Sequence, residues 1–389
     1  MKLNTWPNFT SKEADAVKKI LLSNKVNYLF GDEGKKFEDN FSKFCNVKHS
    51  LAVANGTLAL DLCLRSIQIN QGDEVIVTGR TFIASASCIS ILGGTPVFVD
   101  VDPNSQNIDV NLISKAISKK TKAIICVHFA GYPCNMPKIL EIAKQKNLFV
   151  IEDCAQAHGA MIGNKSVGSF GDINAWSFCN DKIMTTGGEG GMITTNSSKL
   201  YKSACAFNNH GKNFKKFDDI KGKKIFSFPL IHDSLGSNYR MTEMQSVLGN
   251  IQINRLKKWN KLRNRNAEIM IKHLKDLEII NLPLIEEKYT HAYYKFYIVL
   301  NEAYLKKKVS RKKILMKLQK EKIPASFGSS GRVFAEKGFK KYRTFPKDLP
   351  VSSSLEKNSL MFEVHPNLTH KQISHVAMRT REVLLSFQS

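Results

Sequence analysis

Residues 177–191 are Ser-Phe-Cys-Asn-Asp-Lys-Ile-Met-Thr-Thr-Gly-Gly-Glu-Gly-Gly, and the rest of the chain is best interpreted outward from this stretch. Lys182 lies between a small hydroxyl residue, Ser177, and a glycine-dense turn. Apolar residues flank this segment, so we expect a partly desolvated amine, which loses its proton more readily than an exposed one. A neutral amine can attack a carbonyl, and pyridoxal phosphate is the usual partner of such a lysine. A buried structural lysine beside a glycine turn is the alternative that this window leaves open.

Length and composition indicate a globular enzyme. The chain has 389 residues, of which 42% are hydrophobic, 9% aromatic and 24% charged, which argues against disorder. No apolar run approaches membrane-spanning length, and residues 1–7 lack the apolar core of a signal peptide, so we expect a cytoplasmic protein without a membrane partner. The eight cysteines form no Cys-x-x-Cys pair, and we expect neither a disulfide framework nor a metal site.

The formal charge of +24 raises the question of nucleic-acid binding. Lysine greatly outnumbers arginine, and clusters such as 306–308 and 311–313 have the spacing of a solvated helix face. We therefore expect no nucleic-acid partner. A positive field would still attract a small anionic substrate.

Short apolar strands alternate with helical segments through the first half of the chain. Strands are expected at 50–54, 73–78, 96–100, 122–128 and 147–153, and this alternation predicts a mostly parallel sheet between helices. Gly56 and Thr57 follow the first strand and open a helix, which suits a phosphate site but also fits an ordinary strand-to-helix turn. Phe82 follows the second strand, where it either stacks on a flat cofactor ring or packs in the core.

The strand at 147–153 ends in two carboxylates, Glu152 and Asp153. Open α/β sheets bind their ligands at this edge, and an aspartate there can hold the protonated ring nitrogen of pyridoxal phosphate. Gln156 can reach the phenolic oxygen of that ring. His158 is either a wall residue of the site or a structural histidine.

The pattern changes to lysine-rich helix and short strands in the last third of the chain. We expect a large α/β domain over residues 1–255 and a smaller α+β domain over residues 256–389.

Five segments, taken together, resemble the DegT-type sugar aminotransferases in order and spacing over essentially the whole chain. They are Asn55–Thr57, Arg80–Ser85, Glu152–Ala160, Ser177–Gly191 and Ser237–Glu243. Within that family, residues 176–191 look closest to enzymes that make 4-amino-4,6-dideoxyhexoses such as viosamine on a nucleotide carrier.

The resemblance implies a fold type I pyridoxal phosphate enzyme with a mostly parallel sheet of the seven-stranded type, a homodimer with shared active sites, and L-glutamate as amino donor. Lys182 would bond the cofactor and shuttle protons, Asp153 would pair with the ring nitrogen, and Gln156 would lie by the ring oxygen. The remaining cofactor contacts would be Gly56, Thr57 and Ser177 at the phosphate, Phe82 on the ring, and Asn238 at the phosphate of the neighbouring subunit.

The acceptor implied is a nucleotide-linked keto-deoxysugar, dTDP-4-dehydro-6-deoxyglucose or a similar 4-keto hexose, for surface glycans such as the lipopolysaccharide O-antigen. A 3-aminotransferase, an enzyme of UDP- or GDP-linked keto sugars, and a sugar dehydratase are the alternatives. Family dehydratases carry histidine in place of the lysine, so Lys182 favours transamination. Tyr28, His158 and Arg332 are the candidate substrate contacts, and Tyr28 belongs to an aromatic loop expected to line a site or a partner subunit. A nicotinamide enzyme is disfavoured because Gly-x-Gly-x-x-Gly is missing after the first strand.

Overall fold

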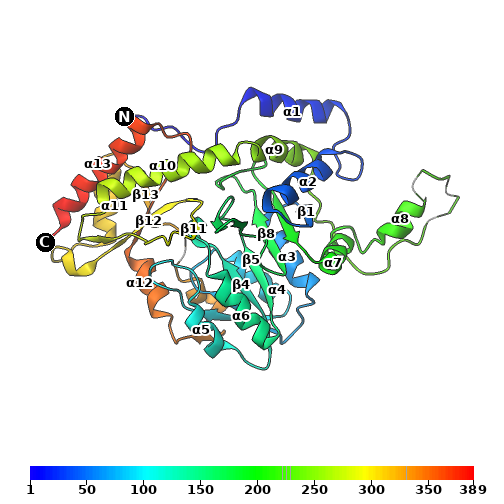
Figure 1. Ribbon diagram of the computed structural model, residues 1–389, viewed down its shortest axis with the longest axis horizontal. Helices are drawn as coiled ribbons and strands as arrows, with labels where there is room; N and C mark the ends of the chain where they lie inside the picture. The colour runs from blue at the N-terminus through cyan, green and yellow to red at the C-terminus, as the bar shows by residue number, and fades with distance from the viewer. Residues whose placement is uncertain (221, 225, 228, 330) are drawn as a thin grey trace.

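The computed structural model describes residues 1–389 except 221, 225, 228 and 330, and within these residues one large sheet organises the fold (Figure 1). The strand order is β1-β9-β8-β5-β4-β2-β3-β14. The strands are β1 (His49–Val53), β2 (Glu74–Thr78), β3 (Thr95–Val99), β4 (Thr121–Val127), β5 (Phe149–Asp153), β8 (Ile173–Ser177), β9 (Gly191–Thr195) and β14 (Thr344–Phe345). The run from β8 to β14 is parallel, whereas β9 is antiparallel to both of its neighbours.

Helices cover both faces of this sheet, as the alternation of strands and helices predicted. Successive residues of β2 show why: Val75 and Val77 pack with α3 (Gly56–Ser66) and α4 (Ala84–Ile91), while Ile76 packs with α5 (Val110–Ala116) and α6 (Met136–Lys146). Because side chains alternate along a strand, a strand buried on both faces must be apolar throughout. The first face also receives α7 (Ser198–Asn208).

The C-terminal part of the chain supplies the eighth strand of the large sheet. β14 pairs in parallel with β3 through Thr344–Phe98 and Phe345–Val99. The seven-stranded type expected from the sequence therefore gains an edge strand, and chain beyond residue 255 returns to the large sheet. The division at residues 255 and 256 stays a prediction.

A second, antiparallel sheet has the order β10-β12-β15-β13. Its strands are β10 (Ile280–Asn281), β12 (Phe296–Leu300), β15 (Ser359–Phe362) and β13 (Ala325–Ser326). Three helices share its apolar core: α10 (Leu256–Leu274), α11 (Arg311–Lys320) and α13 (His370–Phe387). α12 (Pro350–Asn358) precedes β15, and Figure 1 shows α10 running from the large sheet to this second layer.

Short elements complete the architecture. β11 (Tyr289–Thr290), β6 (Met161–Ile162) and β7 (Lys165–Ser166) form a small sheet. The 3-10 helices are η1 (Phe129–Gly131), η2 (Glu302–Tyr304), η3 (Val333–Ala335) and η4 (Lys337–Phe339).

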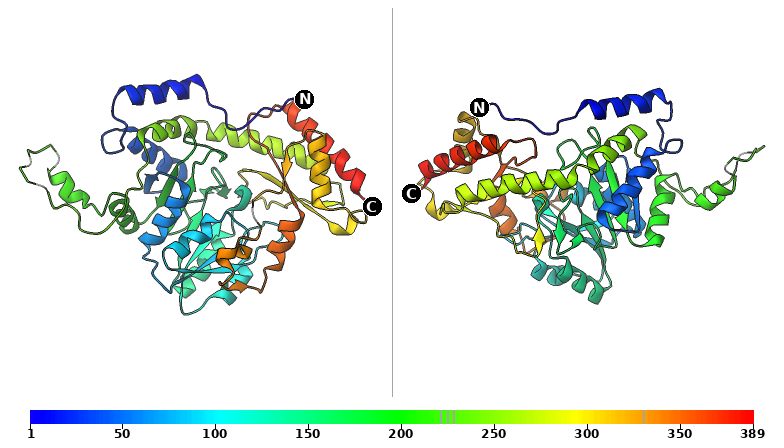
Figure 2. Two further views of the ribbon diagram at one scale, coloured as in Figure 1. Left: turned by 180° about the vertical axis from the view of Figure 1, so that it is seen from behind. Right: turned by 45° about the horizontal axis from the view of Figure 1, so that its top comes forward.

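Among the described residues, four more helices lie beside the large sheet or project from it, and α2 (Glu33–Cys45) buries Phe37, Phe41 and Cys45 in an apolar cluster with Trp176 and Phe178. α1 (Ser11–Leu22) begins with a capping contact, in which the Thr10 backbone N–H donates to the Glu13 side chain at 2.8 Å. α2 also packs against α9 (Glu243–Ile253). α8 (Phe214–Ile220) lies on an arm, made of the described residues between α7 and Asn238, that projects from the body in all three views (Figures 1 and 2). Within the described ranges, no helix combines the length and apolar character needed to cross a membrane.

Candidate active site

The carboxyl ends of β5 and β8 bring two predicted site residues to one edge of the large sheet. Asp153 is the last residue of β5 and pairs in register with Ala175 of β8, two residues before Ser177. Lys182 follows on the turn after β8. Ligands of open parallel sheets bind at this edge.

The start of α3 faces Ser177 at very close range. A Cβ atom added to Gly56 would lie 2.5 Å from the Ser177 Cβ and 2.9 Å from its Oγ, so only glycine fits without displacement. Asn55 caps the helix by accepting the Leu58 N–H at 2.9 Å. The N–H groups of Gly56 and Thr57, in the first turn, have no acceptor within the helix and lie at its positive end. This cradle suits a phosphate group, and the phosphate contact of Gly56 and Thr57 stays a prediction.

Asp153 is a buried carboxylate held by two hydrogen bonds. Its Oδ2 accepts the Ser85 hydroxyl at 2.7 Å and its Oδ1 accepts the Ala155 N–H at 3.1 Å. Thr81 Oγ1 lies 2.8 Å from Ser85 Oγ, which extends the chain of hydrogen bonds to the loop that carries Phe82. Burial raises the pKa of Asp153, although Ser85, Ala155 and the Lys182 charge counteract part of this rise. A cationic ring nitrogen would relieve the cost of that buried charge.

Gln156 and Phe82 offer complementary contacts for a flat ring. The Gln156 Oε1 accepts the Ala130 N–H at 2.8 Å, so the amide nitrogen is the group left to donate to a ligand. Phe82 is 62% exposed, which is unusual for phenylalanine and shows that it is not a core residue. A ring stacked on it would cover that exposed face.

Lys182 has a side chain that is 16% exposed and contacts that the local sequence did not reveal. Its Nζ donates to the Tyr294 hydroxyl at 3.4 Å and lies 3.7 Å from Asp181 Oδ1. The Trp6 indole N–H donates to the Lys182 carbonyl at 2.8 Å and so holds the backbone of the turn. Trp6 and Tyr294 are far from Lys182 in the chain, and no local motif could have placed them there.

Together these residues fit pyridoxal phosphate. The Lys182 amine suits the aldehyde of this cofactor, and the anion cradle at Gly56 suits its phosphate. The buried carboxylate of Asp153 suits the basic ring nitrogen, and the exposed ring of Phe82 suits the aromatic face. Lys182 would hold the cofactor, and Asp153 would keep its ring nitrogen protonated.

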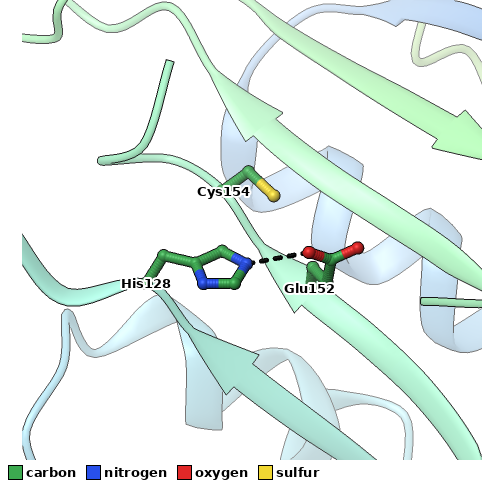
Figure 3. Close-up of side chains that lie close together, drawn as sticks. All are labelled: His128, Glu152 and Cys154. Carbon is green, nitrogen blue, oxygen red and sulfur yellow. Dashed lines mark hydrogen bonds and ion pairs between the residues drawn. The ribbon is translucent and has the colours of Figure 1, made fainter. Parts of the chain in front are cut away.

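Beside Asp153 lies the buried group His128, Glu152 and Cys154, whose ligand-type atoms come within 4.8 Å of one another (Figure 3). The oxygens of Glu152 accept the N–H groups of Gly168, Phe170 and Gly171 at 2.9, 2.8 and 2.7 Å, and His128 Nε2 lies 2.9 Å from Oε2. His128 Nδ1 in turn accepts the Cys134 N–H at 2.9 Å. Because these acceptors are already used, we assign the cluster to fixing the end of β5, not to metal binding.

His158 is fully buried against Trp176 and Phe178, with ring centroids 5.2 and 5.6 Å away. Burial first, and the charges of Lys182 and Arg263 next, lower its pKa to about 3. The histidine is therefore neutral. This packing suits a structural residue behind the site, and the predicted substrate contact stays a prediction.

The other three predicted contacts lie outside this group. Tyr28 is buried and its hydroxyl contacts both Glu38 oxygens, at 2.8 and 2.9 Å, so the aromatic loop is anchored within its own chain. Arg332 is exposed and its guanidinium lies 5.7 Å from the Phe334 ring centroid. Asn238 is exposed at the base of the arm and pairs with Asn209. The roles of all three stay predictions.

The fold and this site define a pyridoxal phosphate-dependent aminotransferase of fold type I. The sequence matches the DegT/DnrJ/EryC1/StrS aminotransferase family over residues 7–381, and the chain belongs to that family. It is thus a relative of nucleotide-sugar aminotransferases, as the sequence motifs indicated.

Three relatives illustrate the similarity. GDP-perosamine synthase of Escherichia coli O157:H7 is 40% identical over 275 residues, 70% of this chain and 71% of the relative. The UDP-N-acetyl-3-dehydro-alpha-D-glucosamine 3-aminotransferase of Acidithiobacillus ferrooxidans is 34% identical over 364 residues, 92% of this chain and 90% of the relative. The crystal structure of an aminotransferase from Psychrobacter cryohalolentis superposes with a TM-score of 0.96 at 44% identity, covering 99% of this chain and 100% of that one.

Proposed function

We propose that this protein transfers the amino group of L-glutamate to the keto carbon of dTDP-4-dehydro-6-deoxyglucose or a similar nucleotide-linked 4-keto hexose. The observation that carries the proposal is the placement of Lys182 at the sheet edge that also holds the anion cradle and Asp153. The relatives' names include GDP- and UDP-linked sugars, which support the substrate class. We further propose a cytoplasmic enzyme that serves surface-glycan synthesis.

Each residue of the site has one task in this reaction. Bound pyridoxal phosphate supplies an electron sink and carries the amino group between donor and acceptor. Gly56, Thr57 and Ser177 hold the phosphate, and Phe82 covers the ring face. Asp153 keeps a proton on the ring nitrogen, while the Lys182 amine takes up and returns the proton at the reacting carbon.

We also propose that two copies of the chain complete each other's sites. Three apolar side chains of the arm are exposed, Phe226 by 95%, Leu230 by 87% and Leu235 by 94%, and such residues are expected to be covered. The arm projects away from its own body in Figure 2 and leads into Asn238. A second copy seated there would receive Asn238 next to its phosphate cradle.

A panel of keto-sugar nucleotides tests the substrate assignment. The purified enzyme, loaded with cofactor and L-glutamate, is offered dTDP-, UDP- and GDP-linked 4-keto and 3-keto hexoses, and products are identified by mass spectrometry and NMR. We expect amination at C4 of the dTDP-linked 6-deoxyhexose to be fastest. Preferred amination at C3, preference for another carrier, or loss of water without gain of nitrogen would each replace the proposed substrate or reaction.

A further inference from the structure

Tyr294, just before β12, connects the reactive lysine with a second acidic group. The Lys182 amine donates to the Tyr294 hydroxyl oxygen at 3.4 Å, and the Tyr294 hydroxyl donates to Asp181 Oδ2. The three groups therefore form one continuous chain of donors and acceptors, from amine to phenol to carboxylate. Asp181 lies within the Ser177–Gly191 segment but was given no role there, and Tyr294 lies outside the five segments.

Two hydrogen bonds hold the backbone of Tyr294, and burial confines its ring. The Tyr294 N–H donates to the Ala130 carbonyl at 2.9 Å, and the Tyr294 carbonyl accepts from Arg263 Nη1 at 3.2 Å. Its ring is buried, and the Lys182 Nζ lies 4.8 Å from the ring centroid. Such a fixed side chain is preorganised for transfer over a short distance.

Tyr294 and Asp181 both have the protonation state that this series of donors and acceptors requires. Burial and then the Asp181 charge raise the pKa of Tyr294, so the side chain remains a phenol with a proton to donate. Burial alone would raise the pKa of Asp181, but the Lys182 charge, the Tyr294 hydroxyl and the Lys295 charge outweigh it and lower that pKa. Asp181 is therefore a carboxylate that can accept.

The hydrogen-bonded series from Lys182 through Tyr294 to Asp181 ends at a cavity on the side of the N-terminal segment. The Asp181 side chain is 52% exposed, and it lines a cavity of about 500 Å³ together with Trp6, Lys295, Glu363 and His365. A proton that reaches Asp181 can thus pass to water in this cavity.

We propose that Tyr294 and Asp181 form a proton relay between the Lys182 amine and solvent. When the Lys182 ammonium loses a proton, that proton goes to the Tyr294 oxygen while the phenolic proton of Tyr294 goes to Asp181. Tyr294 is a phenol before and after the step, and Asp181 then releases its proton to water. The proposal rests on the proposed function, because it gives the relay the task of preparing a neutral amine.

Lys182 Nζ also lies 3.7 Å from Asp181 Oδ1 directly, and further charged groups face these three residues. Lys295 pairs with Glu363 at 2.6 Å, and Arg263 donates to the carbonyls of Tyr293 and Tyr294. Asp153 bonds to Ser85 and Ala155. The neutral His158 and the Tyr297 phenol, whose pKa burial raises, lie nearby, and burial lowers the pKa of His365 in the cavity to about 3.

The matched variants are Tyr294→Phe, Asp181→Asn and a control, Tyr293→Phe. Tyr294→Phe removes the relay oxygen and keeps the ring. The control removes a hydroxyl from the adjacent buried tyrosine, whose ring stacks on His291 at 4.0 Å. Circular dichroism shows whether each variant folds. Because Asp181 is half-exposed, Asp181→Asn still tests the relay if Tyr294→Phe does not fold.

The measurement is the rate at which apoprotein mixed with pyridoxal phosphate forms the borohydride-trapped adduct on Lys182, followed from pH 6 to 9 in H₂O and in D₂O. We expect Tyr294→Phe and Asp181→Asn to slow adduct formation by about a hundredfold, the lower end of what a positioned proton transfer contributes, and to change the solvent isotope effect. Tyr293→Phe should match the wild type. Wild-type rates and isotope effects in both relay variants would overturn the relay, whereas a wild-type protein that forms no adduct on Lys182 would overturn the proposed function instead.

Discussion

Replacing Asp153 by asparagine should have opposite effects on the apoprotein and on the working enzyme. Asparagine can keep both hydrogen bonds, because its Oδ1 can accept the Ala155 N–H while its amide donates to the Ser85 oxygen, which then turns its proton toward Thr81. The substitution thus removes the negative charge and little else.

For the apoprotein, the direction in which stability changes with pH follows from the raised pKa of Asp153. The folded state holds this proton more tightly than the unfolded chain, so stability falls as pH rises from the ordinary carboxyl range, about pH 4, through the folded pKa. Asp153→Asn removes that loss. We expect the two apoproteins to melt alike at low pH, and the variant to melt at a higher temperature at neutral pH.

For the enzyme, the variant loses the ion pair with the protonated ring nitrogen. Charge-assisted hydrogen bonds contribute about 1.5–3 kcal/mol, which corresponds to a loss of about tenfold to about 150-fold in rate. Both half-reactions should slow, the one with glutamate and the one with the keto sugar, because both need the ring as an electron sink.

Differential scanning fluorimetry of the two apoproteins across pH and stopped-flow absorbance of each half-reaction supply the readouts. Asp153→Glu, which keeps the charge but not the geometry, is the control for charge alone. Wild-type half-reaction rates in Asp153→Asn would refute the assignment of this carboxylate to the cofactor, and an apoprotein destabilised at neutral pH would refute the cost of its buried charge.

Two further predictions concern the phosphate cradle and the second subunit. Gly56→Ala places a Cβ 2.5 Å from that of Ser177, and we expect weaker cofactor binding and a loss of about 1–3 kcal/mol in stability; Gly338→Ala, where the added atom meets no neighbour within 4 Å, is the control in thermal melts and cofactor titrations. If Asn238 completes the partner's site, mixing Lys182→Ala with Asn238→Ala protein under subunit exchange should restore activity that each parent lacks, and exchanged heterodimers without recovery would count against a shared site.

Local patterns in the sequence were sufficient for the residues at strand ends. Asp153 lies where a predicted apolar strand stops, and Gly56 opens a helix, so both could be recognised from their neighbouring residues, whereas the role of Ser177 was implied by the family resemblance. The parallel sheet then brings such ends to a common edge without further information.

Contacts between distant segments could not be found in this way. Tyr294 reaches Lys182, and Trp6 bonds to the Lys182 carbonyl, through the packing of the second sheet and the N-terminal segment against the large sheet. Nor did composition separate function from packing at Tyr28, because an aromatic loop without periodicity is compatible with both. Its hydroxyl is bound by the buried Glu38, a partner on the next helix.

The bond between Lys182 and the cofactor is the central claim, and reduction followed by peptide mapping tests it most directly. The purified protein, treated with borohydride and digested, should yield one phosphopyridoxyl peptide modified at Lys182, and Lys182→Ala protein of unchanged fold should yield none. A modified residue other than Lys182, or an equal yield from Lys182→Ala, would contradict the account.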